Sequence, residues 1–205
     1  MATSRRTSTK ATKARGGKDV ILTAATKNFQ AFGYHGTSMR DIARDADVTV
    51  AAIYHHFASK QEILQDIMVR SLSDVISLTR TALLGSGSSS SDQLHALMTA
   101  WILFHTSRQP EAIIGASEIR SLDPSGRRLI TTLRDEQERM FRDVIDRGIA
   151  EGDFATPYSH DAARAIIEMG YAVAAWYRQG GHLHPQEMAQ RYAELALATV
   201  RAAPR

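Results

Sequence analysis

The sequence predicts an all-α protein, with an N-terminal three-helix head that contains a helix-turn-helix and a larger helical body, about nine helices in total. Two patterns predict this fold. Beyond Lys60, apolar residues recur every three or four positions almost to the end of the chain, which is the period of one helix face. Before Lys60, the small Ala43, a turn at Asp47 and the apolar Ile53 have the spacing of two short helices that cross closely. That spacing is typical of DNA-reading helix-turn-helix units.

Composition narrows the class of protein. The 205 residues are enough for a small head and a larger body, and the absence of cysteine excludes disulfides and thiolate metal sites. The N-terminus lacks an apolar signal segment, and no run approaches the roughly 18 apolar residues of a membrane span. We therefore expect a cytoplasmic protein with no membrane partner.

Charge is concentrated in the first part of the chain. Residues 1–60 contain ten Lys or Arg and four Asp, a net charge of +6, whereas the remainder carries −3. Positive potential therefore gathers where phosphates would be met. Residues 1–17 have basic and hydroxyl side chains and no acid, so we expect a disordered basic arm. The arm would either contact DNA or only keep the protein soluble. Residues 18–64 then form the helix-turn-helix domain, and residues 65–205 form the body.

The second helix of the motif is predicted over about Thr49 to His56, with the Thr49 hydroxyl as its N-cap. Ile53 and Phe57 lie four residues apart and point inward. The opposite side carries Val50, Ala51, Tyr54 and His55. Small apolar groups there can touch a thymine methyl, and Tyr or His can bond a phosphate or a base edge. The alternative is an ordinary helical hairpin with an inactive exposed face.

The flanking segments carry a family resemblance. Phe32-Gly33-Tyr34-His35-Gly36-Thr37-Ser38-Met39 precedes the motif, and Phe57-Ala58-Ser59-Lys60-Gln61-Glu62-Ile63-Leu64 follows it. From about Lys18 to Val69 the chain resembles the N-terminal domain of TetR-family transcriptional repressors. The family usually has Gly where this chain has Asp47, but Asp also tolerates the left-handed conformation of such a turn. The resemblance implies double-stranded operator DNA as partner, and the expected contact residues are Thr37, Ser38, Arg40, Thr49, Val50, Ala51, Tyr54, His55 and Lys60.

Beyond Lys60 the pattern predicts a helix of about 25 residues, roughly 37 Å long, that links head and body. A Gly/Ser-rich loop over residues 85–91 ends it, and Asp92 is the expected cap of the next helix, Gln93 to about Arg108. A shorter helix runs from Pro110 through Arg120. After residues 123–126, a long helix ends near Gly152, and two apolar, alanine-rich helices complete the chain.

The last two helices predict a dimer surface, because two such apolar helices at a chain end would leave a large patch exposed in a monomer. In the TetR family the corresponding helices form a four-helix homodimer interface, which would present two recognition helices to one operator. The residues we assign to it are Ile166, Gly170, Val173, Ala174, Tyr177, Tyr192, Leu195 and Thr199. The alternative is that some of them belong to the core of the protomer.

The resemblance also implies an effector cavity in the body, where effector means the small hydrophobic molecule that releases the repressor from DNA. The residues we place around it are Met98, Trp101, Phe104, His105, Ser117, Leu133, Gln137, Met140, Phe141 and Trp176. Each also fits a plain core position, but buried His105, Ser117 and Gln137 would need polar partners. Glu151-Gly152-Asp153-Phe154 and the segment 174–181 are similar to family members that sense acyl-CoA thioesters. Drug-sensing efflux regulators are the competing subclass.

The sequence contains no catalytic motif, so an all-helical enzyme is the less favoured class and no cofactor is expected. His55 and His56 diverge by about 100 degrees on a helix and cannot chelate one metal ion. His182 and His184 supply only two ligands, so we assign no metal site.

Overall fold

A computed structural model describes residues 4–201 of the chain, and over that range the backbone forms nine α-helices, one 3-10 helix and no strand. The all-α prediction is confirmed. The helices are α1 (Ser4–Phe32), α2 (Met39–Asp45), α3 (Val50–His56), α4 (Lys60–Leu84), α5 (Ser90–Ser107), α6 (Gln109–Ser117), the 3-10 helix η1 (Glu118–Ser121), α7 (Pro124–Glu151), α8 (Ser159–Trp176) and α9 (Pro185–Thr199). None of the described helices is both long and apolar enough to cross a membrane.

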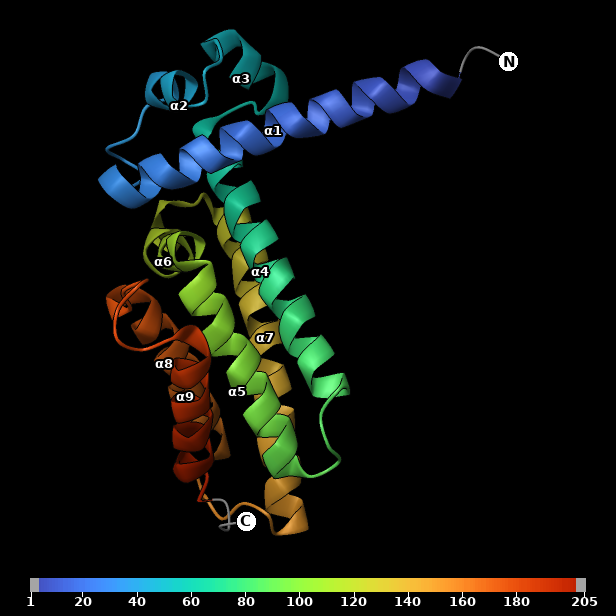
Figure 1. The fold of residues 1–205 in the computed structure, drawn as a ribbon, viewed down its shortest axis with the longest axis vertical. Coiled ribbons are helices and arrows are strands. Elements are labelled where there is room, and N and C mark those ends of the chain that lie inside the picture. The colour runs from blue at the N-terminus through green and yellow to red at the C-terminus, as the bar shows by residue number, and fades with distance from the viewer. Residues whose placement is uncertain (1–3, 202–205) are drawn as a thin grey trace.

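The head consists of α1, α2 and α3, and it lies across one end of the body (Figure 1). Ser38 and Asp41 form a reciprocal capping box at the start of α2, and the Thr49 hydroxyl accepts the Ala52 amide at the start of α3. Between these helices Asp47 has φ 52°, the left-handed turn conformation predicted for this position. Caps and turn together fix the angle between α2 and α3.

The N-terminal arm differs from the sequence-based expectation. The backbone is helical from Ser4, so α1 extends through most of residues 1–17 and projects beyond the head in Figure 1. Lys, Arg and Ala in this segment favour helix, and extending an existing helix needs no new nucleation. Residues 1–3 lie outside the described range.

The body is a bundle entered by α4, which starts in the head and runs unbroken past residues 64 and 65 (Figure 1). Helix α5 packs between α4 on one side and α9 on the other, and α7 and α8 also contact it. Its cap differs by one turn from the prediction, because the Ser89 hydroxyl, not Asp92, accepts the first free amide and the helix begins at Ser90. Gly152 ends α7 with φ 83°, a conformation that glycine adopts without strain.

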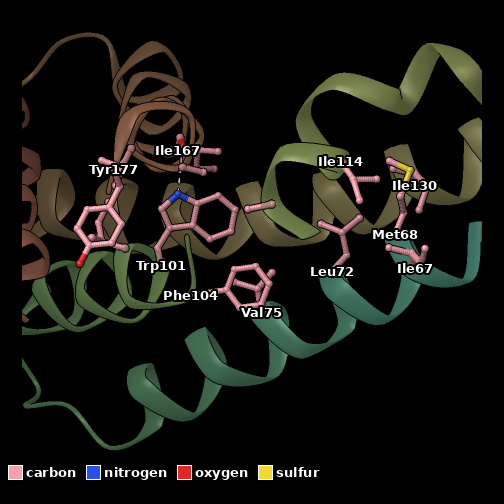
Figure 2. Close-up of a cluster of buried hydrophobic side chains, with 14 of the residues drawn as sticks. Ile67, Met68, Leu72, Val75, Trp101, Phe104, Ile114, Ile130, Ile167 and Tyr177 are labelled. Carbon is pink, nitrogen blue, oxygen red and sulfur yellow. Dashed lines mark hydrogen bonds between the residues drawn. The ribbon is translucent and has the colours of Figure 1, made fainter. Parts of the chain in front are cut away.

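Trp101 occupies the centre of this bundle (Figure 2). Its indole Nε1 donates a hydrogen bond to the Ile167 carbonyl of α8 at 3.0 Å, which satisfies the one polar atom of a side chain that is 1% exposed. Gly170 makes this contact possible, since a β-carbon at that position would lie 2.0 Å from Nε1. Leu72 and Val75 of α4 and Phe104 of α5 complete the apolar surroundings in Figure 2.

Candidate DNA-binding surface and effector cavity

One face of α3 is exposed to solvent and available to a partner. Ile53 and Phe57 are buried in the head, whereas Ala51, Tyr54 and His55 are exposed, with Tyr54 at 53%. Thr49, Ser38 and Arg40 are exposed beside this face, at the starts of α3 and α2. Val50 is half-buried and packs partly against the head core, so it offers less surface than expected.

The charges of α2 are arranged unevenly. Arg44 is paired with Asp41 at 3.0 Å and with Asp45 at 3.2 Å, and Asn28 of α1 donates to Asp45 at 2.8 Å. The Asn28 hydrogen bond lowers the pKa of Asp45, and the bond from Ser38 lowers that of Asp41. These carboxylates compensate Arg44, but no described residue forms an ion pair with Arg40. Arg40 is therefore the exposed cation of α2 that remains available for a phosphate.

Two predicted contact residues serve the fold of the head instead. Thr37 is 2% exposed, and its hydroxyl donates to the Gly33 carbonyl at 2.9 Å. The Lys60 ammonium donates to the carbonyls of Tyr34 and Thr37, both at 2.6 Å, and lies 4.2 Å from the centroid of the Tyr34 ring. Burial lowers the pKa of Lys60. Both residues hold the α1–α2 turn, and their side-chain donors are engaged within the protein.

A small cavity of about 20 Å³ lies inside the body, next to Trp101. Five helices line it, and the lining residues are Met68, Ser71, Leu72, Val75, Trp101, Phe104, His105, Glu111, Ala112, Gly115, Arg134 and Tyr171. Trp101, Phe104 and His105 are on the predicted list. The sequence did not predict the contributions of α4, Arg134 and Tyr171, and on α6 it predicted Ser117 where Glu111, Ala112 and Gly115 line the cavity, because the period of a single helix does not reveal which residues meet around a space.

His105 is the most buried polar group of this cavity, at 1% exposed. Its Nδ1 lies 2.8 Å from the Trp101 carbonyl, and its ring packs against Trp101 and Tyr171 at centroid distances of 4.2 and 5.2 Å. A carbonyl only accepts, so Nδ1 carries the proton. Burial lowers the pKa of His105 to about 4, which keeps the imidazole neutral near pH 7.

The remaining predicted effector residues lie elsewhere. Ser117 is exposed and its hydroxyl donates to Ile113, whereas Trp176 is 50% exposed at the end of α8. Met140 borders a different surface hollow, beside Arg80 and Glu136. The other four belong to the core or its edge: Met98, Phe141 and Gln137 are buried, and Leu133 is half-buried. Met98 and Gln137 lie three residues from the lining residues Trp101 and Arg134 on the same helices, so helix periodicity indicated α5 and α7 without fixing which turns face the cavity.

A larger cleft of about 450 Å³ separates α1 of the head from α4 and the start of α6. Arg70 crosses it to Asp19 of α1 at 2.8 Å, and Arg108 is bonded to Glu111 at 2.8 Å. Glu111 lines both this outer cleft and the inner cavity. Glu111 therefore borders both spaces while it is held in a partly buried ion pair with Arg108.

The predicted dimer surface divides into two groups. Ile166, Gly170, Val173, Ala174 and Tyr177 are buried within the protomer, as the core alternative expected. An arginine at Gly170 would strike Trp101, so it cannot report on a dimer. Leu195 is 50% exposed, and Tyr192 and Thr199 are half-buried, so only α9 residues of the predicted set face outward. Ala172, Ala175 and Trp176 of α8 are exposed apolar residues that periodicity did not separate from the buried face.

Family models match both parts of the chain. A model described as bacterial regulatory proteins, tetR family, matches residues 21–67, and one described as Tetracyclin repressor-like, C-terminal domain, matches residues 87–200. The chain belongs to the TetR family. It is a TetR-family helix-turn-helix transcriptional repressor and not an enzyme.

TetR-family relatives cover nearly the whole chain. The transcriptional repressor KstR2 of Mycobacterium tuberculosis (strain ATCC 25618 / H37Rv) is 29% identical over 182 residues, which span 88% of this chain and 90% of KstR2. A regulatory protein of the tetR family from Rhodococcus RHA1 has a crystal structure with a TM-score of 0.87, 30% identity, and coverage of 92% of this chain and 98% of that one. AibR, solved with isovaleryl coenzyme A and operator DNA, has a TM-score of 0.81 at 21% identity, with 91% and 100% covered, and shows the shared fold.

Proposed function

We propose that this TetR-family protein is a homodimeric repressor that binds a near-palindromic operator through α3 and is released by a small hydrophobic effector. The observation that carries the proposal is the α3 face, where Ala51, Tyr54 and His55 are exposed while Ile53 and Phe57 anchor the helix. Small and hydrogen-bonding side chains on an exposed, firmly anchored helix suit direct readout in a major groove.

We further propose that the effector is an acyl-CoA thioester. The inner cavity offers apolar walls to an acyl group, and the outer cleft offers charged side chains, including Lys27, Arg70 and Arg108, to the polar part of a thioester. AibR, which has the same fold, was solved in complex with isovaleryl coenzyme A, and this supports the acyl-CoA ligand class. The cavity of about 20 Å³ would have to widen to admit an acyl chain, so binding is coupled to movement of its walls.

The route from cavity to head runs through α6 and η1. Glu111, Ala112 and Gly115 of α6 line the cavity, and η1 follows α6 directly. Glu118 of η1 accepts the Tyr34 amide of the head at 3.3 Å. An effector that binds more tightly to a widened cavity would displace α6 and η1, change the head position, and remove the match to one DNA turn of about 34 Å.

Operator binding is tested by fluorescence anisotropy with the DNA upstream of the protein's own gene, against shuffled DNA. Ala51→Glu places a carboxylate against DNA and should abolish specific binding without changing the melting temperature, because Ala51 is exposed. Ala150→Glu, at an exposed position on α7, is the matched control and should bind normally. If Ala51→Glu binds the operator with normal affinity, α3 is not the recognition helix.

The ligand class is tested by melting-temperature shifts with short- and medium-chain acyl-CoAs and with planar aromatic drugs, since a ligand that binds the native state raises its stability. We expect a shift with acyl-CoA, together with release of the DNA. A shift with the drugs alone would assign the protein to the efflux subclass and reject the acyl-CoA proposal.

A further inference from the structure

Arg134 is the one cavity-lining residue with a charge that no described residue neutralises. It projects from α7, and its Nη2 donates to the Gly115 carbonyl of α6. Its guanidinium lies 5.6 Å from the centroid of the Tyr171 ring. The Nε atom is buried and has no hydrogen-bond partner, and within the described part of the chain no carboxylate forms an ion pair with Arg134.

The other ionisable groups of the cavity do not balance this charge. Glu111 is the only acidic residue in the lining, and Arg108 holds its carboxylate at 2.8 Å. His105 is neutral at physiological pH because burial lowers its pKa to about 4. The cavity therefore keeps one positive charge without an ion-pair partner among the described residues, together with a buried Nε–H donor that has no hydrogen-bond acceptor. A ligand that supplied an acceptor oxygen there would satisfy both.

We propose that Arg134 binds the acyl oxygen of the effector, either the carbonyl of a thioester or the oxygen of a free carboxylate. The assignment rests on the proposed function, since it concerns the same cavity. The apolar chain of the ligand would lie against Leu72, Val75 and Phe104, which line the same space. Arg134 is thus a specificity-determining residue, because it favours acyl compounds over apolar molecules of equal length that lack a carbonyl or carboxylate.

The arrangement of the walls gives the effector an entry point. Glu111 borders both the inner cavity and the outer cleft, and it forms an ion pair with Arg108, which lines the cleft. A ligand entering from the cleft would pass Glu111 with its apolar end first. The depth of the acyl oxygen of a free acid or a thioester would therefore be set by the length of its chain. We expect the binding affinity of acyl ligands of one chain length to depend most strongly on Arg134.

The test compares octanoate, octanoyl-CoA and 1-octanol on the full-length protein by isothermal titration calorimetry. We expect the wild type to bind at least one of the two acyl probes more tightly than 1-octanol. Arg134→Leu should weaken that probe roughly ten- to hundredfold and leave 1-octanol unchanged, as expected for loss of a charged hydrogen bond. Arg139→Leu removes an exposed arginine from the same helix and should change none of the three affinities.

The two acyl probes distinguish the source of the oxygen. If only the affinity for octanoyl-CoA falls in Arg134→Leu, the oxygen bound by Arg134 is a thioester carbonyl. If only the affinity for octanoate falls, it is a free carboxylate. If Arg134→Leu does not fold, Arg134→Gln, which keeps amide donors for the Gly115 carbonyl, decides by the same criterion.

Three results would overturn the inference: no acyl probe binds the wild type, 1-octanol binds as well as both acyl probes, or the folded Arg134 variants bind all probes with wild-type affinity. Operator affinity without any probe is measured in parallel. Normal operator binding by wild type and variants, with no Arg134 dependence, rejects this inference alone. Absent operator binding by the wild type rejects the proposed function instead.

Discussion

His105 makes the stability of this TetR-family protein depend on pH in a defined window. In the fold its pKa is depressed to about 4, below the ordinary 6.5, so the unfolded chain takes up a proton between these values and the folded chain does not. The contribution of His105 to the free energy of unfolding is therefore complete above pH 6.5, and it is lost progressively as the pH falls to 4. The total loss amounts to roughly 3 kcal/mol.

We therefore expect urea-unfolding free energies to fall between pH 7 and pH 4.5, and His105→Gln to remove most of that slope. Carboxyl groups with lowered pKa, such as Asp45, titrate below this window and do not account for it. An unchanged slope in His105→Gln would show that another group titrates here.

Gly170 and Asp47 differ in how much of their surroundings the sequence predicts. Gly170 was assigned to a close contact between helices, and that chemistry is right, but the neighbour is Trp101 of the same chain. A small residue in a helix indicates a close approach without naming the partner. Asp47 was predictable for the opposite reason: its left-handed turn is a local property of two or three residues.

At the scale of elements, Lys60 joins the first residue of α4 to the turn between α1 and α2. Replacing it by Met removes the donor to the Tyr34 and Thr37 carbonyls and should lower the unfolding free energy by about 1 to 2 kcal/mol. The salt dependence of operator binding should stay unchanged, since the ammonium is engaged inside the protein.

Arg40→Ala supplies the contrasting variant for the same experiment. It should leave the melting temperature unchanged and reduce the slope of log K against log salt by about one, as expected for loss of one phosphate contact. If Lys60→Met instead reduces this slope and Arg40→Ala leaves it unchanged, Lys60 contacts DNA and Arg40 does not.

Helices and their ends followed well from the sequence, because caps, glycines and a 3.6-residue period are all local. Helix α4 ends at Leu84 and α7 is followed by Gly152, close to the predicted limits. The cavity did not follow equally well. Arg134 and Tyr171 come from helices whose relative rotation depends on packing across the whole body, so a polar residue on α7 could not be distinguished from its solvated neighbours.

We expect the proposed dimer of the whole protein to use the outward face of α8 and α9, because the other residues of the predicted interface are buried in the protomer. Leu195 is half exposed in the protomer, so Leu195→Glu should leave the protomer folded and shift sedimentation toward the monomer, with weaker operator binding. Leu78→Glu, at an equally exposed leucine on α4, is the control and should remain dimeric. A dimeric Leu195→Glu with normal operator affinity would place the interface elsewhere.

The head is joined to the body by more than the continuous helix α4. Asp19 pairs with Arg70, Lys18 lies 3.4 Å from Asp66, and Glu118 receives the Tyr34 amide. A DNA-binding domain transplanted from another regulator would arrive with its own surface on α1 and would lose these matched pairs. A chimeric regulator built on this body therefore needs a head whose charged residues match those of the body at their contact. Choosing one point in the sequence at which to join the two domains does not provide this match.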